Sequence, residues 1–221
     1  MIHMTIIAHG NGLAAFRRHI PLWQEHHADA ALVLVPENDP IEQQESPWPV
    51  VRLGNAEHNG VQSRIRLRWL LDHLSQQTNC SHFIIHEYDS FSLSGHVKFQ
   101  TGFCGNVFGN WDRDRFLAWR YVNPPWTVDY GGLCAMWKAA RRWPDLLEEG
   151  EADRYLSALA VLANVPILPH DPKGYSYNWI TEKEVAPMRK AIYDGGTLIH
   201  GVKQKWVLEA ALQFYDERPK Q

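Results

Sequence analysis

The sequence predicts an α/β fold, a single domain in which a mostly parallel sheet carries helices on both of its faces. Short runs of consecutive apolar and β-branched residues recur along the chain, as in strands that are buried on both faces. Longer segments with apolar residues three to four positions apart alternate with these runs, and strands that alternate with helices build parallel sheets. The chain has 221 residues and neither a repeat nor a linker, which fits one domain with a sizeable core.

The amino-terminal half shows the alternation most clearly. A first apolar run is followed by a segment of helical spacing, which Pro21 interrupts, and then by a second apolar run. This strand, helix, strand order predicts a right-handed parallel crossover. The strands of this half are expected at 5–8, 30–35, 50–53 and 82–87, and the helices at 13–27 and 61–77.

The second half is less regular. Residues 93–122 are rich in glycine and aromatic residues without a periodic pattern, and 123–126, with two prolines, are expected to form a rigid loop. The segment 128–137 leads into a helix that is expected to end near Arg142 and Trp143. Further helices are expected at 154–163 and 206–215, with a short strand at 165–168. The predicted organisation is a nucleotide-binding half (1–92), an acceptor-binding half (93–205) and a carboxyl-terminal helix (206–221).

Composition excludes several classes of function. Hydrophobic residues make up 45% of the chain and charged residues 21%, which indicates an ordered globular protein. The net charge of −3 provides no general positive field for nucleic acid or anionic lipid. The cysteines lack metal-ligand spacing, no apolar stretch reaches the roughly 18 residues of a membrane span, and the first ten residues lack a signal-peptide pattern. We therefore expect a cytoplasmic protein with reduced thiols.

Two acidic residues follow the most apolar run. Glu87 and Asp89 are two positions apart, so their side chains share a face if the backbone stays extended. Ligands of open α/β sheets bind beyond the carboxyl ends of the strands. Two carboxylates at such a place suit Mg²⁺ or Mn²⁺ held jointly with substrate phosphates. The alternative is that Glu87 is a surface charge and that Asp89 caps a turn with Ser90.

The order of motifs resembles that of GT-A-fold glycosyltransferases, which use nucleotide sugars. Glu87-Tyr88-Asp89 stands where that family has its D-x-D motif, with Glu in place of the first Asp. The segment 131–137 resembles the family's small-residue acceptor segment. Glu151-Ala152-Asp153 is similar to its acidic helix start, and 200–203 resembles its late histidine element.

This resemblance implies a donor, a metal and a set of site residues. The donor is a nucleoside-diphosphate sugar, and the cofactor is Mn²⁺ or Mg²⁺ held by Glu87, Asp89 and His200. Imidazole favours the softer Mn²⁺. The further roles are as follows: Lys203 for the diphosphate; His9, Gly10, Asn38, Asp39 and Arg64 for the nucleotide; Asp153, or else Glu151, as catalytic base of an inverting transfer; Trp126, Gly131, Gly132 and Trp137 for the acceptor.

Other functions remain open at this stage. A nucleotidyltransferase of related fold would also use acidic residues and a metal, but it would favour a glycine-rich basic segment that 9–13 lacks. Glu in place of Asp at position 87 leaves open a non-catalytic nucleotide-sugar-binding protein. A metal hydrolase built on His9, His86, His170 and His200 is a third alternative. A saccharide is the favoured acceptor, with a protein or a modified nucleic-acid base as the alternatives.

Overall fold

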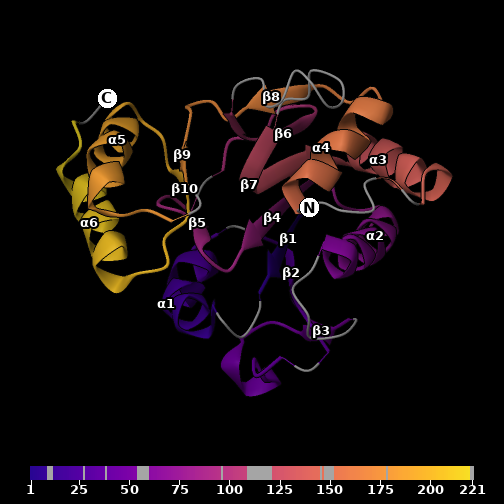
Figure 1. Ribbon diagram of the computed structural model, residues 1–221, viewed down its shortest axis with the longest axis horizontal. Helices are drawn as coiled ribbons and strands as arrows, with labels where there is room; N and C mark the ends of the chain where they lie inside the picture. Colours follow the sequence, from indigo (N-terminus) through magenta and orange to yellow (C-terminus); the bar gives the residue numbers. More distant parts are fainter. Residues whose placement is uncertain are drawn as a thin grey trace.

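A seven-stranded sheet in the order β3-β2-β1-β4-β7-β6-β8 runs through the molecule (Figure 1). The computed structural model describes residues 1–8, 12–26, 28–37, 39–53, 60–95, 97–108, 121–144, 146, 152–177 and 179–219. The strands of this sheet are β1 (Ile2–Ile7), β2 (Ala30–Val35), β3 (Val50–Arg52), β4 (His82–Glu87), β6 (Phe103–Phe108), β7 (Tyr121–Asp129) and β8 (Ile167–Pro169). The pairing makes every strand parallel to β4 except β7, which runs antiparallel between β4 and β6.

Helices cover both faces of the sheet, as the sequence predicts. The helices are α1 (Leu13–Gln24), α2 (Gly60–Ser75), α3 (Tyr130–Arg142), α4 (Ala152–Leu162), α5 (Glu182–Tyr193) and α6 (Lys205–Glu217). Apolar side chains of α2, α3 and α4 form one buried cluster with one face of the sheet. Those of α1, α5 and α6 belong to a second cluster on the other face. Figure 1 shows α5 and α6 together at one end of the molecule and α2 and α3 at the other.

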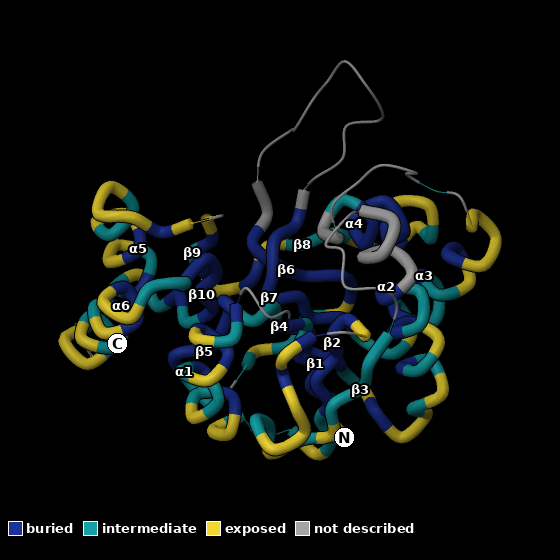
Figure 2. Tube along the Cα trace, turned by 60° about the horizontal axis from the view of Figure 1, so that its bottom comes forward, coloured by how far each residue is buried: buried dark blue, intermediate teal, exposed yellow. Residues whose placement is uncertain are grey.

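The two faces of each central strand explain the unbroken apolar runs. In β2, Leu32 and Leu34 belong to the first cluster, whereas Val33 and Val35 belong to the second. Successive side chains of a strand point to opposite faces, so a strand between two helical layers needs an apolar residue at every position. Figure 2 shows these central strands buried, while parts of α5 and α6 are exposed.

A small second sheet joins the carboxyl-terminal segment to the end of β4. Its strands are β5 (Ser90–Ser92), β10 (Leu198–His200) and β9 (Tyr175–Ser176), in the order β5-β10-β9. β10 pairs antiparallel with β5, so His200 lies opposite Ser90. Beyond this pair, the backbone N–H groups of Gly201 and Val202 both donate to the carbonyl oxygen of Asp89, at 3.1 and 3.0 Å. The sheet therefore fixes residue 200 beside the turn that follows β4.

The loop predicted at 123–126 is wrong. The segment is part of β7, and Trp126 within it is fully buried. Its indole Nε1 donates to the carbonyl oxygen of Val122 at 2.7 Å, which satisfies the only polar atom of the ring in the core. Helix α5 was not predicted, because Pro187 and several charged residues obscure its apolar stripe. Among the described residues, no helix has the length and apolar character that a bilayer span requires.

Candidate functional site

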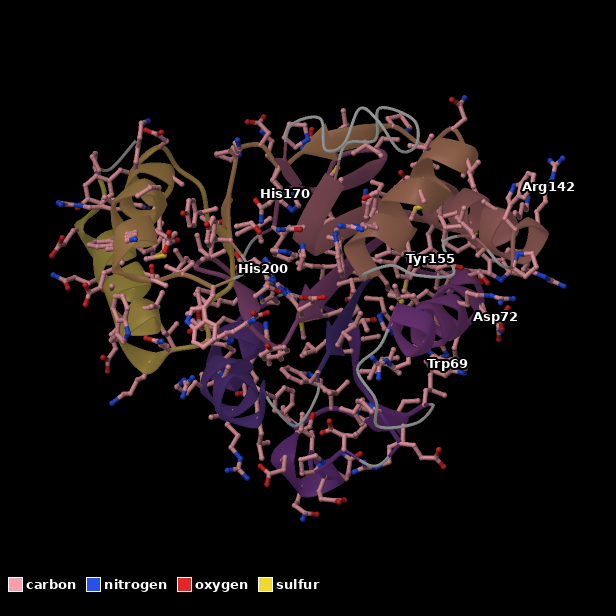
Figure 3. All side chains as sticks on the ribbon, in the orientation of Figure 1. Trp69, Asp72, Arg142, Tyr155, His170 and His200 are labelled. Atoms are coloured by element: carbon pink, nitrogen blue, oxygen red, sulfur yellow. The ribbon has the colours of Figure 1, made fainter. Side chains whose placement is uncertain are left out.

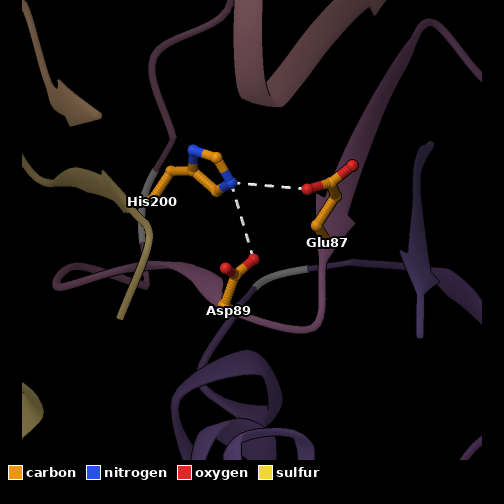
Figure 4. A group of neighbouring side chains, drawn as sticks. All are labelled: Glu87, Asp89 and His200. Atoms are coloured by element: carbon orange, nitrogen blue, oxygen red, sulfur yellow. Dashed lines mark ion pairs between the residues drawn. The ribbon is translucent and has the colours of Figure 1, made fainter. Parts of the chain in front are cut away.

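Two carboxylates and an imidazole meet at the carboxyl end of β4 (Figure 4). His200 Nε2 lies 3.3 Å from Glu87 Oε2 and 3.5 Å from Asp89 Oδ1. One ligand atom from each of these three residues lies within 4.8 Å of the others. The structure thus brings together the three residues that the sequence predicts as metal ligands.

The turn between β4 and β5 sets the directions of the two carboxylates. β4 ends at Glu87, and Tyr88 and Asp89 form a turn before β5 begins at Ser90. The Ser90 hydroxyl accepts from the backbone N–H of Glu87 at 2.9 Å and donates to its carbonyl oxygen at 3.1 Å, which closes the turn. The carboxylates therefore converge through a turn and not, as the two-residue spacing suggested, along one face of an extended strand.

A buried polar chain orients the ring of His200. Nδ1 of His200 lies 2.8 Å from Ser176 Oγ, and the side-chain amide of Asn123 donates to the same hydroxyl at 3.0 Å. Asn123 lies in β7 beside the end of β4, and Ser176 lies in β9 beside β10. This contact holds Nδ1 away from the acids and leaves Nε2 facing them.

Lys203 adds a positive charge to the cluster. Its ammonium lies 3.6 Å from Asp89 Oδ2, and 5.9 Å from the centre of the Tyr88 ring. The backbone of the same residue is held by Arg18, whose Nη2 donates to the Lys203 carbonyl oxygen at 2.6 Å. Tyr88 in turn packs so closely on Gly12 that a Cβ atom at position 12 would overlap its ring. The cluster is thereby braced against the start of α1.

The residues of this cluster fit a divalent cation. The Asp89 side chain is only 2% exposed and that of His200 is 7% exposed, while Glu87 is 28% exposed and open to solvent. Asp89 Oδ1 accepts no hydrogen bond from any residue that the structure describes. Two carboxylates face one ammonium, so the cluster keeps a net negative charge that a bound cation would neutralise. Oxygen ligands with one imidazole nitrogen suit Mn²⁺ or Mg²⁺.

The other buried histidines do not belong to the cluster. His86 lies on β4 against Trp23 and His26, and burial holds its pKa well below the usual value. Burial also lowers the pKa of His170 to about 4, and its Nε2 donates to the carbonyl oxygen of Pro125 at 2.8 Å. Among the described residues, the metal-binding group contains neither of these two rings, which argues against a hydrolase centre built on them.

Most of the predicted nucleotide-binding and base residues fall on parts of the chain without described side chains. His9, Gly10, Asn38 and Glu151 are outside the described residues, and Arg64 and Asp153 lie in helices where only the backbone is described. Asp39, in contrast, is described, and its place after β2 can be compared with the prediction.

Asp39 is buried and closes a turn. Its Oδ1 accepts from the backbone N–H of Ile41 at 2.9 Å. Burial lowers the pKa of Arg66, and the nearby Asp39 carboxylate opposes that effect. The contact of Asp39 with a nucleotide stays a prediction.

The predicted acceptor segment lies at the opposite edge of the sheet. Because β7 runs antiparallel, its last residue, Asp129, pairs with His82 at the start of β4. Gly131 and Gly132 begin α3 directly after Asp129, about 17 Å of strand away from Glu87. Trp137 Nε1 donates to Asp72 on α2, and Figure 3 shows Asp72 well separated from His200. These residues and the buried Trp126 are therefore not part of the acid cluster, and their contact with an acceptor stays a prediction.

Three residues of the site carried no signal in the sequence. Ser176 and Asn123 reach His200 only because β9 and β7 flank it, and Tyr88 was noted only as the middle of the acidic motif. A single serine or asparagine has no periodic pattern, so only the pairing of strands distant in sequence reveals such contacts.

The solved structures that are similar to this chain include a glycosyltransferase and a cytidylyltransferase. A glycosyltransferase involved in the glycosylation of the major capsid of PBCV-1 aligns over 97% of this chain and 99% of its own, with 11% identity and a TM-score of 0.50. The 2-C-methyl-D-erythritol 4-phosphate cytidylyltransferase from Thermus thermophilus aligns over 75% of this chain and 87% of its own, with 16% identity and a TM-score of 0.44. No protein-family model and no curated protein matches the sequence. At such low identity the first likeness establishes the fold alone, and it confirms the predicted α/β class.

Proposed function

We propose that the chain is a metal-dependent glycosyltransferase that moves a sugar from a nucleoside-diphosphate sugar to an acceptor hydroxyl. The observation that carries this proposal is the convergence of Glu87, Asp89 and His200 at the carboxyl end of β4. That end of the central strand is where open α/β sheets bind their ligands. The resemblance of the fold to a glycosyltransferase is consistent with this function.

The three clustered side chains would hold Mn²⁺ or Mg²⁺. The bound ion would act as a Lewis acid that neutralises charge on the diphosphate leaving group. Lys203, beside Asp89, is placed to add a point charge to the same diphosphate. Residues His9, Gly10, Asn38, Asp39 and Arg64 belong to segments that follow β1, β2 and β3, and we assign the nucleotide to this side of the cluster.

The transfer needs a group that accepts a proton. The acceptor oxygen bonds to the anomeric carbon while the bond from that carbon to the phosphate oxygen breaks, and the nucleoside diphosphate leaves with the electron pair. The hydroxyl proton passes to a carboxylate, for which we propose Asp153, with Glu151 as the alternative. β8 runs parallel to β4 and directly follows α4, so α4 begins at the same edge of the sheet as Glu87. This placement supports a base at the start of α4.

A panel of nucleoside diphosphates and nucleotide sugars tests the donor. Thermal unfolding is followed for each compound with Mn²⁺ and with EDTA. A true donor at 100 times its Kd should stabilise the protein by about 2.7 kcal/mol, and only when the metal is present. Stabilisation without release of sugar to any acceptor would indicate a binding protein. Stabilisation by the metal alone, with no further effect of any nucleoside diphosphate or nucleotide sugar, would overturn the proposal.

The base is tested by Asp153→Asn. The variant should keep donor binding and lose about two to four orders of magnitude in kcat, because the lost interaction belongs to the transition state. The matched control is Asp171→Asn, since Asp171 is an exposed acid that pairs only with the exposed Lys98 among the described residues. Full activity in both Asp153→Asn and Glu151→Gln would exclude a base in this segment.

A further inference from the structure

Large aromatic side chains gather on the surface beside the acid cluster. Tyr177 is 48% exposed, Trp179 is 51% exposed and Trp206 is 39% exposed. The first two lie in the loop between β9 and α5, and the third lies in the first turn of α6. Large aromatic side chains are on average mostly buried, and exposed groups of them mark binding surfaces.

The backbone ties this surface to the cluster. The N–H of Tyr177 donates to the carbonyl oxygen of His200 at 3.4 Å, and that of Ile180 donates to Gly201 at 3.1 Å. The ammonium of Lys203 lies 3.6 Å from Asp89 and 5.8 Å from the centre of the Trp179 ring. One lysine therefore lies beside both Asp89 and the exposed indole of Trp179, so the aromatic surface borders the acid cluster.

A hollow continues this surface away from the cluster. It has a volume of about 330 Å³ and is lined by Thr181, Glu182, Lys183, Gln204 and Trp206. This volume lies within the range of about 300–1,000 Å³ that is typical of small-molecule sites. The indole Nε1 of Trp206 donates to the side-chain oxygen of Gln204, which holds the ring at the edge of the hollow.

The chemistry of the lining selects among ligands. Glu182 and Lys183 cancel in charge, so the hollow favours a neutral ligand over a phosphate or a cation. A hydroxyl, a carboxylate, an ammonium and an amide offer hydrogen bonds, and the indole face attracts C–H groups. A saccharide presents both hydroxyl groups and an apolar C–H face. A carboxylate in the lining argues against nucleic acid, and the polar lining argues against a lipid surface.

We propose that Tyr177, Trp179 and Trp206, with the hollow beside them, bind a neutral saccharide as the acceptor. This inference rests on the proposed glycosyltransferase function and replaces the acceptor segment that the sequence suggested. The acceptor would approach from the side of α5 and α6, while the nucleotide occupies the side of β1 and β2. The two substrates would then meet at the acid cluster between them.

Saccharide binding without a donor tests the surface directly. The fluorescently labelled full chain is applied to a glycan array, and the strongest-binding glycan is titrated against each variant. Trp206→Ala and Trp179→Ala should each raise the Kd for that glycan by about tenfold or more. The control is Trp143→Ala, because Trp143 has a similar exposure of 47% but follows α3. This control should stay within twofold of the wild type.

The indole N–H resonances give a second readout that does not depend on activity. On addition of the glycan, the resonances of Trp179 and Trp206 should shift, and those of the fully buried Trp23 and Trp126 should not. Equal effects of Trp206→Ala and Trp143→Ala, or no glycan that binds, would overturn the inference. Binding to phosphatidylcholine–phosphatidylglycerol vesicles that is lost in Trp206→Ala, or a dimer that this variant dissociates, would overturn it as well.

Failure of the acceptor surface and failure of the proposed function are distinguishable. If no nucleotide sugar binds but the glycan shifts the indole resonances of Trp179 and Trp206, the surface is supported as a saccharide site and the transferase function is excluded. If sugar transfer is observed and Trp206→Ala keeps the wild-type KM for the acceptor, the transferase stands and this surface is wrong. Support for both requires a KM for the acceptor that rises about tenfold in Trp206→Ala while the KM for the donor changes less than twofold.

Discussion

The two ring nitrogens of His200 face different partners, and the position of one proton decides what the ring can bind. Nε2 faces Glu87 and Asp89, and Nδ1 faces the hydroxyl of Ser176. A metal ligand needs the lone pair of Nε2, so Nδ1 must carry the proton and donate it to Ser176 Oγ. A hydroxyl oxygen can accept from both His200 and Asn123, so this tautomer is compatible with the observed contacts.

Ser176→Ala tests this positioning role. Loss of a group that orients a ligand histidine typically lowers metal affinity by about 10–100-fold. We expect a loss of this size in a calorimetric titration with Mn²⁺, together with a change in the ¹⁵N shifts of the His200 ring. Ser92→Ala is the matched control, because Ser92 is also a buried serine of the small sheet but its hydroxyl donates to Ser94. Equal affinity in the two variants would show that Ser176 is only a packing residue.

At the scale of elements, the turn after β4 depends on the start of α1. Gly12 directly precedes α1. A Cβ atom at this position would overlap the ring of Tyr88, the residue between Glu87 and Asp89 in the sequence. The absence of a side chain at position 12 therefore allows the helix to brace the turn. The sequence shows a glycine at position 12, but only the structure shows which ring this glycine accommodates.

Gly12→Ala should displace Tyr88 and with it the turn that carries Asp89. We expect a loss of about 1–3 kcal/mol in the free energy of unfolding, as for other overpacked sites, and a weaker affinity for Mn²⁺. Urea unfolding and metal titration measure the two effects. Gly131→Ala is the control, because only the Asp129 carboxylate lies near its added Cβ, and its stability should stay within about 1 kcal/mol of the wild type. A Gly12→Ala variant with unchanged stability and metal affinity would contradict the bracing role.

The elements differ in how much the sequence reveals. β2 and β4 were predictable because their central positions carry apolar residues on both faces, and both faces are buried. β9 has two residues and β5 and β10 have three each, too few for a period to show. Glu87 and Asp89 could be found because they follow a short apolar run, and His200 only through the order of motifs. The antiparallel direction of β7 places Gly131 at the edge of the sheet opposite Glu87, and no local pattern reveals this direction.

At the scale of the whole molecule, neutral histidines are buried inside the fold. Burial lowers the pKa of His19 and of His170 to about 4, from the ordinary value of 6.5. Between these two pH values the unfolded chain binds protons that the folded chain does not. Stability from these groups is therefore fully present above about pH 6.5 and is lost as the pH falls toward 4.

Urea unfolding between pH 7 and pH 4 should show this loss. Each buried histidine contributes a slope of about 1.4 kcal/mol per pH unit at most, so the urea midpoint should fall steadily below pH 6.5. His170→Gln should reduce the dependence of the unfolding free energy on pH by the contribution of one histidine, even if it lowers the stability at pH 7. A urea midpoint that stays constant down to pH 4.5 would show that these rings accept protons within the fold.

The central claim is that Glu87, Asp89 and His200 form a metal site that binds a nucleoside diphosphate. Calorimetric titration with UDP, GDP, ADP and CDP, each with Mn²⁺ and with EDTA, tests it most directly in the wild type, in Asp89→Asn and in the surface control Asp194→Asn. We predict that one diphosphate binds the wild type and the control only with Mn²⁺. Asp89→Asn, although nearly isosteric and folded, should lose at least about 100-fold in this affinity, because a buried ligand charge is removed. Equal affinity in EDTA, or an Asp89→Asn variant that binds like the wild type, would contradict the account.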